Sequence, residues 1–401
     1  MEKIKRDTYL SILKDFKDKQ IIKVITGIRR CGKSSLLELF QQYLKENGVS
    51  EEQIVSINFE NADYEELQDR KKLYEYLKKK LVKNKKTYIF LDEIQNVPEF
   101  EKTVDSLFIN KDIDLYITGS NAYLLSSEIA TLLTGRYVKI KMLPLSFQEY
   151  LSTFDDKTDI STKFRNYLRY SSFPQSIELY NINPNNIELF LDGIYNTILF
   201  KDVMQRKGIT DKSTLERVTK YLYDNIGNRT SMKNISDNIE GLTKNNSYNT
   251  ISNYIDALID SYMVYKANRY DIKGKELLKT QEKYYAVDIG LRYYMLGQSS
   301  GRDMGHILEN VVYLELLRRG YKVYTGKVDD LEIDFVAKNS EDTVYYQVAL
   351  TTRDESIIQR ELAPLKKIND NYPKYILTLD DDLDADFEGI KKINVIDWLL
   401  K

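Results

Sequence analysis

The segment from Gly27 to Ser35 reads GIRRCGKSS and lies between an apolar run, QIIKVIT, and a run with helical spacing of leucine, LLELFQQYL. Its spacing, Gly27-x-x-x-x-Gly32-Lys33-Ser34, is that of a P-loop. Glycine lets the backbone curve closely around phosphate oxygens, and the N-terminus of the following helix favours anions. The order strand, glycine-rich loop, helix therefore predicts a nucleoside-triphosphate site in a parallel α/β sheet.

The loop offers candidate contacts for ATP and for Mg²⁺. We expect Lys33 to reach the β- and γ-phosphates and the Ser34 hydroxyl to bind Mg²⁺. The residues expected to line the nucleotide are Gly27, Arg29, Arg30, Cys31, Gly32, Lys33, Ser34 and Ser35. Cations near Cys31 could lower the pKa of its thiol and make it reactive. The alternative is a side chain that points away from the nucleotide.

A second apolar run, Tyr88–Leu91, ends in the acid pair Asp92-Glu93. A strand beside the P-loop strand would bring Asp92 to the Mg²⁺ and Glu93 to the γ-phosphate, where Glu93 would polarise the attacking water. The run follows the P-loop by about sixty residues, which leaves room for one strand and two helices. ATP and Mg²⁺ are therefore the expected cofactors.

Polar residues also follow the next strand patterns. Ser120 and Asn121 come after the run Ile113–Ile117, at the strand end where open α/β sheets bind ligands. Either could sense the γ-phosphate, and a helix N-cap is the alternative role for both. Arg136 precedes a strand-like run and is a candidate for stabilising transition-state charge, in cis or from a neighbouring subunit. An arginine in a surface turn is the other interpretation.

Several segments together resemble one large family. They are KRDTYLSIL, VITGIRRCGKSSLL, IFLDEIQNV, ITGSNAYLLS, LTGR and LPLSFQEYL. The family comprises predicted bacterial and archaeal ATPases with an AAA-type P-loop domain, a middle region and a C-terminal domain of unknown function. The resemblance covers the whole chain, and LPLSFQEYL is its most specific part because no general nucleotide chemistry requires it. It implies ATP binding and hydrolysis in the cytoplasm and leaves the biological role open.

Composition limits the remaining choices. The chain of 401 residues is too long for one core, so two to four domains are expected. Its net charge of −2 argues neither for nor against nucleic acid. Cys31 and His306 are the sole cysteine and histidine, so neither an intrachain disulfide nor a zinc site is expected. No apolar run approaches the length of a membrane span, so we expect no contact with a membrane.

The chain divides into four expected domains with an α/β fold overall. Residues 1–145 alternate strand and helix patterns, with strands expected at Ile21–Thr26, Ile54–Asn58, Tyr88–Leu91, Ile113–Thr118 and Tyr137–Met142. Residues 146–205 read as helices broken at Phe173-Pro174 and resemble the helical lid of an AAA core. Residues 206–285 have the element order of a winged helix, and residues 286–401 form the last domain.

The winged-helix region is a candidate DNA-binding module. Its expected recognition helix spans about Ser247 to Ser261, and the segment 201–283 has a net charge of +4. The residues expected to face DNA are Ser247, Asn249, Thr250, Ser252 and Asn253, with Lys273 and Lys275 in the wing. The helix has no Lys or Arg and ends DALID, which suits a phosphate backbone poorly. Packing between domains is therefore the alternative role.

The order of elements after residue 300 resembles the PD-(D/E)XK nuclease core. Helix, three strands, helix and strand are expected there, and the acids of such a core bind a metal that activates water. The resemblance assigns Glu309 to the helix acid, Asp334 to the strand acid and Gln347 to the third position. Ala349 stands where the core has its lysine, so the domain is expected to be an inactive relative.

Three functions remain open at this point. The first is an ATP-hydrolysing switch whose closure is sensed by the later domains. The second is an ATP-gated nuclease or defence factor. The third is a nucleotide sensor that docks a protein partner. DNA, a protein partner or further copies of the chain are the candidate macromolecular partners.

Overall fold

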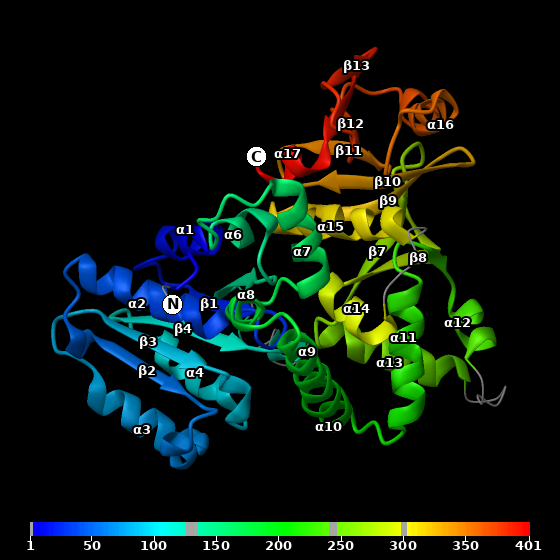
Figure 1. Ribbon diagram of the computed structural model, residues 1–401. Helices are drawn as coiled ribbons and strands as arrows, with labels where there is room; N and C mark the ends of the chain where they lie inside the picture. Colours follow the sequence, from blue (N-terminus) through cyan, green and yellow to red (C-terminus); the bar gives the residue numbers. More distant parts are fainter. Residues whose placement is uncertain (1–2, 126–132, 134, 240–246, 298–302) are drawn as a thin grey trace. The chain divides into compact units, whose positions relative to one another are not determined.

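The computed structural model in Figure 1 describes residues 3–125, 133, 135–239, 247–297 and 303–401. The chain forms two compact units. The first unit comprises Met1–Pro144, Phe173–Glu178 and Asp260–Tyr262, and the second comprises Leu145–Ser172, Leu179–Ile259 and Met263–Lys401. Among the described residues, no helix is both long enough and apolar enough to cross a membrane.

The first unit is built on a five-stranded sheet in the order β2-β3-β4-β1-β5. Its strands are β1 (Ile22–Thr26), β2 (Ile54–Asn58), β3 (Thr87–Asp92), β4 (Ile113–Gly119) and β5 (Tyr137–Lys141). All neighbouring pairs run parallel, so the predicted parallel sheet is confirmed. Because every strand points the same way, the residues that follow their carboxyl ends share one edge of the sheet.

Helices cover both faces of this sheet. They are α1 (Asp7–Asp15), α2 (Lys33–Glu46), α3 (Arg70–Lys80) and α4 (Phe100–Phe108). Short 3₁₀ turns lie at Glu51–Gln53, Ala62–Gln68, Ile94–Asn96 and Ala122–Leu125. On one face, α3 and α4 pack against the same core as β1, through residues such as Leu73, Val104 and Val24. On the other, Phe40 of α2 lies against the rings of Phe90 and Tyr116.

The second unit starts with a series of helices. Its helices are α6 (Phe147–Leu151), α7 (Ile160–Tyr170), α9 (Asn186–Thr197), a π-helical segment (Ile198–Met204), α10 (Gln205–Lys207), α11 (Lys212–Asp224), α12 (Met232–Asn238), α13 (Ser247–Asp260), α14 (Ile289–Leu296), α15 (Met304–Arg318), α16 (Glu355–Lys366) and α17 (Val395–Leu399). Helix α8 (Pro174–Ile182) begins in the first unit. The predicted break at Phe173-Pro174 is present, since Ser171 ends α7 with a left-handed φ of +79° and Pro174 begins α8.

One nine-stranded sheet runs through the second unit in the order β13-β14-β12-β11-β10-β9-β7-β8-β6. Its strands are β6 (Arg229–Thr230), β7 (Val264–Asp271), β8 (Glu276–Ala286), β9 (Lys322–Val328), β10 (Leu331–Lys338), β11 (Thr343–Val348), β12 (Lys374–Thr378), β13 (Ala385–Phe387) and β14 (Ile390–Asn394). Strand β7 pairs in parallel with β9, so the sheet continues across the boundary that we expected at residues 285 and 286. This joining of two regions was not predicted.

Candidate functional site

The P-loop connects β1 to α2 through a turn that requires glycine at two positions. Gly32, directly before α2, has a left-handed φ of +104°. A Cβ atom on Gly27 would lie 2.2 Å from the carbonyl oxygen of Met142. Arg30 is also left-handed, with φ of +68°. Backbone that mixes left- and right-handed residues in this way forms concavities lined by N–H groups, which bind anions, so the loop fits the phosphates of a nucleotide.

Lys33, the first residue of α2, turns back into this loop. Its side chain is only 3% exposed. The ammonium donates hydrogen bonds to the carbonyl oxygens of Gly27 (3.1 Å) and Ile28 (3.3 Å) and to the hydroxyl of Ser120 (2.8 Å). It also lies 3.4 Å from the carboxylate of Glu93. These contacts fix the Lys33 ammonium beside the P-loop, where it can bind an anion.

Glu93 follows β3 in a left-handed conformation, with φ of +54°, which turns its side chain toward the P-loop. Its carboxylate accepts hydrogen bonds from the Ser120 hydroxyl and from the Gln95 amide. Burial opposes ionisation of Glu93, but the Lys33 ammonium and these hydrogen bonds outweigh it and lower the pKa of the carboxyl to about 2. Glu93 is therefore ionised at neutral pH, as a group that accepts a proton must be.

Asp92, the last residue of β3, lies in a more polar network than its neighbour. The Asn58 amide donates to it (3.0 Å), and the Thr118 hydroxyl donates to its other carboxylate oxygen. Burial raises the pKa of the Asp92 carboxyl, while hydrogen bonds from Ser34 and Thr118 act in the opposite direction. Asp92 and Ser34 therefore meet, and together they supply the oxygen donors that Mg²⁺ prefers.

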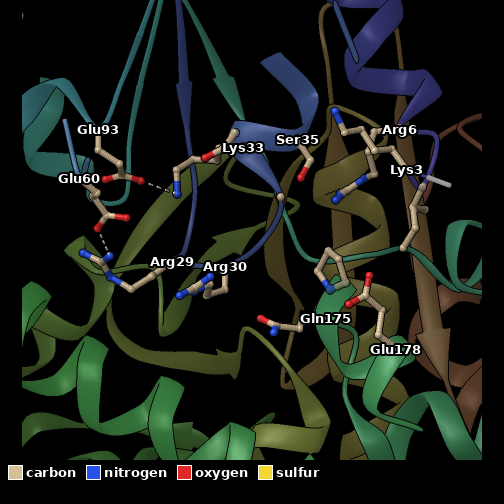
Figure 2. Close-up of a pocket in the computed structure, with 14 residues that line it drawn as sticks. Lys3, Arg6, Arg29, Arg30, Lys33, Ser35, Glu60, Glu93, Gln175 and Glu178 are labelled. Atoms are coloured by element: carbon tan, nitrogen blue, oxygen red, sulfur yellow. Dashed lines mark hydrogen bonds and ion pairs between the residues drawn. The ribbon is translucent and has the colours of Figure 1, made fainter. Parts of the chain in front are cut away.

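These residues border a cavity of about 360 Å³ within the first unit (Figure 2). Figure 2 shows Lys33 facing Glu93, and Arg29 facing Glu60, with which it forms an ion pair. The predicted residues on the cavity wall are Arg29, Arg30, Gly32, Lys33, Ser34, Ser35 and Glu93. The prediction missed Lys3, Ile4, Arg6, Glu60, Pro174, Gln175 and Glu178. They come from three separate segments, and no spacing in the sequence links them to the P-loop.

Arg6 is the most informative of the missed residues. It is 2% exposed, and its guanidinium donates to the backbone carbonyl oxygens of Cys31 (2.9 Å) and Leu143 (2.6 Å). These bonds connect the N-terminal segment to the middle of the P-loop and to the chain after β5. Arg6 thus fixes the loop through its backbone.

Cys31 points into the protein. Its side chain is fully buried, and burial raises the pKa of the thiol despite the nearby Lys33 and Arg6. The structure therefore favours the interpretation in which Cys31 points away from the nucleotide, and it does not support a reactive thiolate.

Ser120 and Asn121 both follow β4 and are both buried. The Ser120 hydroxyl contacts Lys33 and Glu93, and the backbone carbonyl oxygen of Asn121 accepts the N–H of Leu124 (3.2 Å) at the start of a turn. The hydroxyl of Thr118, two residues earlier in β4, accepts the N–H of Glu93 (3.0 Å). Ser120 therefore touches both charged residues of the site, and which of Ser120 and Asn121 senses the γ-phosphate stays a prediction.

Arg136 does not reach this site in the same chain. It precedes β5, and its carbonyl oxygen accepts the N–H of Ile22, the first residue of β1. It therefore lies at the amino ends of the strands, the edge opposite the P-loop. Its guanidinium pairs with Asp105 and is 44% exposed. Action in cis is therefore not supported, while action on a neighbouring subunit and a plain surface turn both remain open for Arg136.

The predicted nuclease-like residues of the second unit do come together. Glu309 of α15 is 5% exposed, and Asp334 of β10 shares a cation with it. That cation is Lys283 of β8, whose ammonium lies 2.8 Å from Glu309, 2.7 Å from Glu332 and 3.7 Å from Asp334. The Tyr285 hydroxyl also donates to Glu309 (2.6 Å). The acids therefore surround the ammonium of Lys283, a residue that was not predicted to belong to this cluster.

The charges of this acid cluster depend on Lys283. Burial opposes charge on Lys283, but the three acids outweigh it and raise the pKa of the ammonium. Burial also opposes ionisation of Glu309, but Lys283 outweighs it and lowers the pKa of that carboxyl. Burial and the neighbouring Glu309 raise the pKa of Asp334 to about 8. Lys283 thus keeps the buried carboxylate of Glu309 ionised, but it does not offset the unfavourable effect of burial and of Glu309 on the charge of Asp334.

Gln347, the third nuclease-like position, is engaged on both sides of its amide. Its oxygen accepts the N–H of Asp334 (2.7 Å), and its nitrogen donates to Glu361 (2.8 Å). Ala349 is buried and has no polar side chain. In the described part of the chain, no group of three or more His, Cys, Asp or Glu side chains is arranged to hold a metal ion.

The parallel sheet, the P-loop and the acid pair after β3 define a P-loop nucleotide-binding domain. A family model described as an AAA domain matches residues 19–151. A second model, described as a domain of unknown function (DUF8612), matches residues 161–302. The latter covers the middle of the chain and not the C-terminal region to which the resemblance had assigned a domain of unknown function.

Two relatives extend over nearly the whole chain. An uncharacterized protein of Haemophilus influenzae is 39% identical over 402 residues, covering 99% of both chains. Uncharacterized protein MJ1544 of Methanocaldococcus jannaschii is 32% identical over 397 residues, covering 94% of this chain and 85% of the relative. The chain belongs to the family of these proteins, and its N-terminal part matches the model of an AAA domain.

Solved structures resemble the chain only in part. The Walker-type ATPase PABY2304 of Pyrococcus abyssi covers 73% of this chain and 95% of its own, with a TM-score of 0.46 and 13% identity. AMPPCP-bound DnaA from Aquifex aeolicus covers 63% of this chain and 86% of its own, with a TM-score of 0.32 and 12% identity.

The Lys283 cluster gives a prediction about stability. Lys283→Met keeps most of the side chain's length but leaves the buried acids without their cation. We expect the free energy of unfolding of the second unit to fall by about 3–5 kcal/mol at pH 8. The loss should be smaller at pH 5. Without the ammonium the pKa values of the clustered carboxyls rise, the folded variant then binds more protons than the unfolded chain, and its stability falls as pH rises.

Denaturant titration at both pH values measures this effect. The fluorescence of Trp398, the sole tryptophan, reports unfolding of the second unit. Lys266→Met is the matched control, since Lys266 is exposed on the neighbouring strand β7. A Lys283→Met protein as stable as the control at both pH values would contradict the electrostatic role of Lys283.

Proposed function

We propose that this chain is an ATP-hydrolysing switch. The observation that carries the proposal is the buried contact of Lys33, Ser120 and Glu93, in which the P-loop lysine lies 3.4 Å from a carboxylate with a pKa of about 2. The γ-phosphate of ATP is a competing anion for Lys33. When it binds, Glu93 loses its cation and becomes free to accept a hydrogen bond from the attacking water.

Each neighbouring group has a distinct role in this mechanism. Lys33 binds and orients the phosphates, and Ser120, which touches both partners, reports whether the γ-phosphate is present. Asp92 and Ser34 would hold Mg²⁺, which when bound neutralises phosphate charge. The oxygen of the water attacks the γ-phosphorus while Glu93 accepts a proton from that water. The bond between the γ-phosphorus and the oxygen that bridges it to the β-phosphate breaks, giving ADP and phosphate.

The second unit is proposed to respond to the nucleotide. The boundaries at 145, 205 and 285 remain proposals, with residues 146–205 as the helical lid. The element order α11, β6, α12, α13, β7, β8 supports a winged helix in residues 206–285. The order α15, β9, β10, β11, α16, β12 supports a core of the PD-(D/E)XK type in residues 286–401.

Two observations argue against the other functions for these regions. Lys273, one of the proposed wing lysines, pairs with Asp329 at 2.6 Å, which reduces the positive charge that the hairpin offers to DNA. In the nuclease-like core, Lys283 lies among the acids that would have to bind a metal. The Lys273 pair weakens the case for DNA binding by the hairpin, and the position of Lys283 weakens the case for DNA cleavage. For both regions we therefore favour a role in packing or in docking a protein partner.

The ATPase proposal predicts different effects for two substitutions. Lys33→Ala should abolish ATP binding. Glu93→Gln should bind ATP at least as tightly as the native chain, because Lys33 is released from its competing carboxylate. It should hydrolyse ATP at least about a hundredfold more slowly, as expected for the loss of a positioned base. Nucleotide binding by fluorescence and phosphate release measure the two effects.

Glu99→Gln is a suitable control because Glu99 lies in the loop after β3, is exposed and pairs with the surface cations Arg70 and Lys102. Its ATPase rate should equal that of the native chain. Normal turnover by Glu93→Gln would show that Glu93 is not the group that activates water.

The composition of the nuclease-like core predicts that plasmid and linear DNA stay intact with Mg²⁺ or Mn²⁺, with or without ATP. Ala349 offers no ammonium to polarise water. Lys283 forms ion pairs with the acids that would otherwise bind the metal. Gel electrophoresis after prolonged incubation tests this. Metal-dependent cleavage that disappears in Asp334→Ala would contradict it and revive the ATP-gated nuclease.

A further inference from the structure

Helix α3 and its connection to β3 carry a concentration of positive charge that the nucleotide site does not use. Residues 70–86 contain nine lysine or arginine residues and one acid, Glu75. This segment therefore has a net charge of +8, although the whole chain has −2. Figure 1 shows α3 beside the edge strand β2 of the first unit.

The charges form a stripe on the helix. At about 100° per residue, positions seven apart lie almost above one another. Lys71 and Lys78 therefore form one row, and Lys72 and Lys79 form an adjacent row, both exposed. Leu73 and Leu77, on the opposite side of the helix, are fully buried in the core of the first unit. The stripe thus faces away from the sheet, with Glu75 as its one acid.

Most of these cations lack acidic partners. Arg70, Lys72 and Lys85 pair with surface glutamates, at 2.9, 3.9 and 3.5 Å. By contrast, five exposed lysines form no ion pair with any residue that the structure describes: Lys71, Lys78, Lys79, Lys80 and Lys83. These five exposed lysines give the surface a positive potential that attracts an external anion.

The chemistry of the stripe narrows the class of anion. A membrane-binding helix needs an apolar face to insert, but the apolar side of α3 is already packed in the core. Lysine ammonium groups are point charges on flexible stems, which suit a row of phosphates and do not read bases. We propose that α3 and residues 81–86 bind the phosphate backbone of a nucleic-acid duplex without sequence preference.

This surface is separate from the nucleotide site. Lys83 and Lys85 precede β3, whereas Asp92 and Glu93 follow it, so the two groups lie at opposite edges of the sheet. A strand of six residues separates them, or about 20 Å. Duplex binding is thus expected to survive Lys33→Ala, and a failure of this proposal is distinguishable from a failure of the ATPase proposal.

Fluorescence anisotropy with 30-base-pair DNA and RNA duplexes tests the proposal on the full chain. If five lysines contact phosphates, log K against log salt should have a slope of about −4.5. Lys78→Glu, Lys79→Glu and Lys80→Glu together should weaken binding at least tenfold and make the slope shallower. The triple change to glutamine, which cannot repel phosphates, should weaken binding less but in the same direction. Comparison of the two duplexes shows which nucleic acid is preferred.

Two control variants make the result specific. Lys157→Glu, Lys220→Glu and Lys391→Glu, all at exposed positions of the second unit, change the net charge as much as the triple glutamate change in α3. This control should keep the duplex affinity within twofold of that of the native chain. Lys273→Glu with Lys275→Glu tests the wing in the same way. The proposal is overturned if the duplexes do not bind at 50 mM salt, if the controls lose as much affinity as the α3 variant, or if anionic-lipid vesicles bind while duplexes do not.

Discussion

The site of this protein depends on the fact that a charge can be buried only beside an opposite charge. Lys33 and Glu93 have side chains only 3% and 7% exposed, and each keeps the other ionised. Ser120 bridges them, Thr118 fixes the backbone of Glu93, and Arg6 holds the loop from behind. If either charge were absent, the other would be left buried without its partner, so the two side chains hold each other in position.

The second unit meets the same constraint with a different outcome. Lys283 has three acids around it and a side chain 4% exposed, so an incoming anion would have to displace several carboxylates at once. Among the residues that the structure describes, Lys33 forms an ion pair with one carboxylate, that of Glu93, and it borders a cavity of about 360 Å³. The first pair is thus suited to exchange partners, and the second is suited to stay fixed.

Local sequence predicted the parts of the fold and site that local chemistry determines. The P-loop spacing, the apolar runs and the acid pair after β3 each lie within a few residues, and the parallel sheet they predicted is confirmed. Arg6, Glu60 and Gln175 were missed because only the folded chain brings them to the cavity. The sequence left the role of Arg136 open, and the pairing of its carbonyl oxygen with the N–H of Ile22, which places it at the amino ends of the strands, is a contact that only the assembled sheet shows.

Lys283 shows most clearly where sequence reasoning ends. Lys283 lies near the end of one expected domain, whereas the lysine of a nuclease core is expected at position 349, within the next. In the structure β7 pairs with β9, which makes the two regions one sheet and brings β8 to the acids of α15 and β10. The sequence around Lys283 does not distinguish this buried lysine from a lysine exposed to solvent. What selects it is the unfavourable free energy of leaving Glu309 buried and unpaired, which is a property of the assembled sheet.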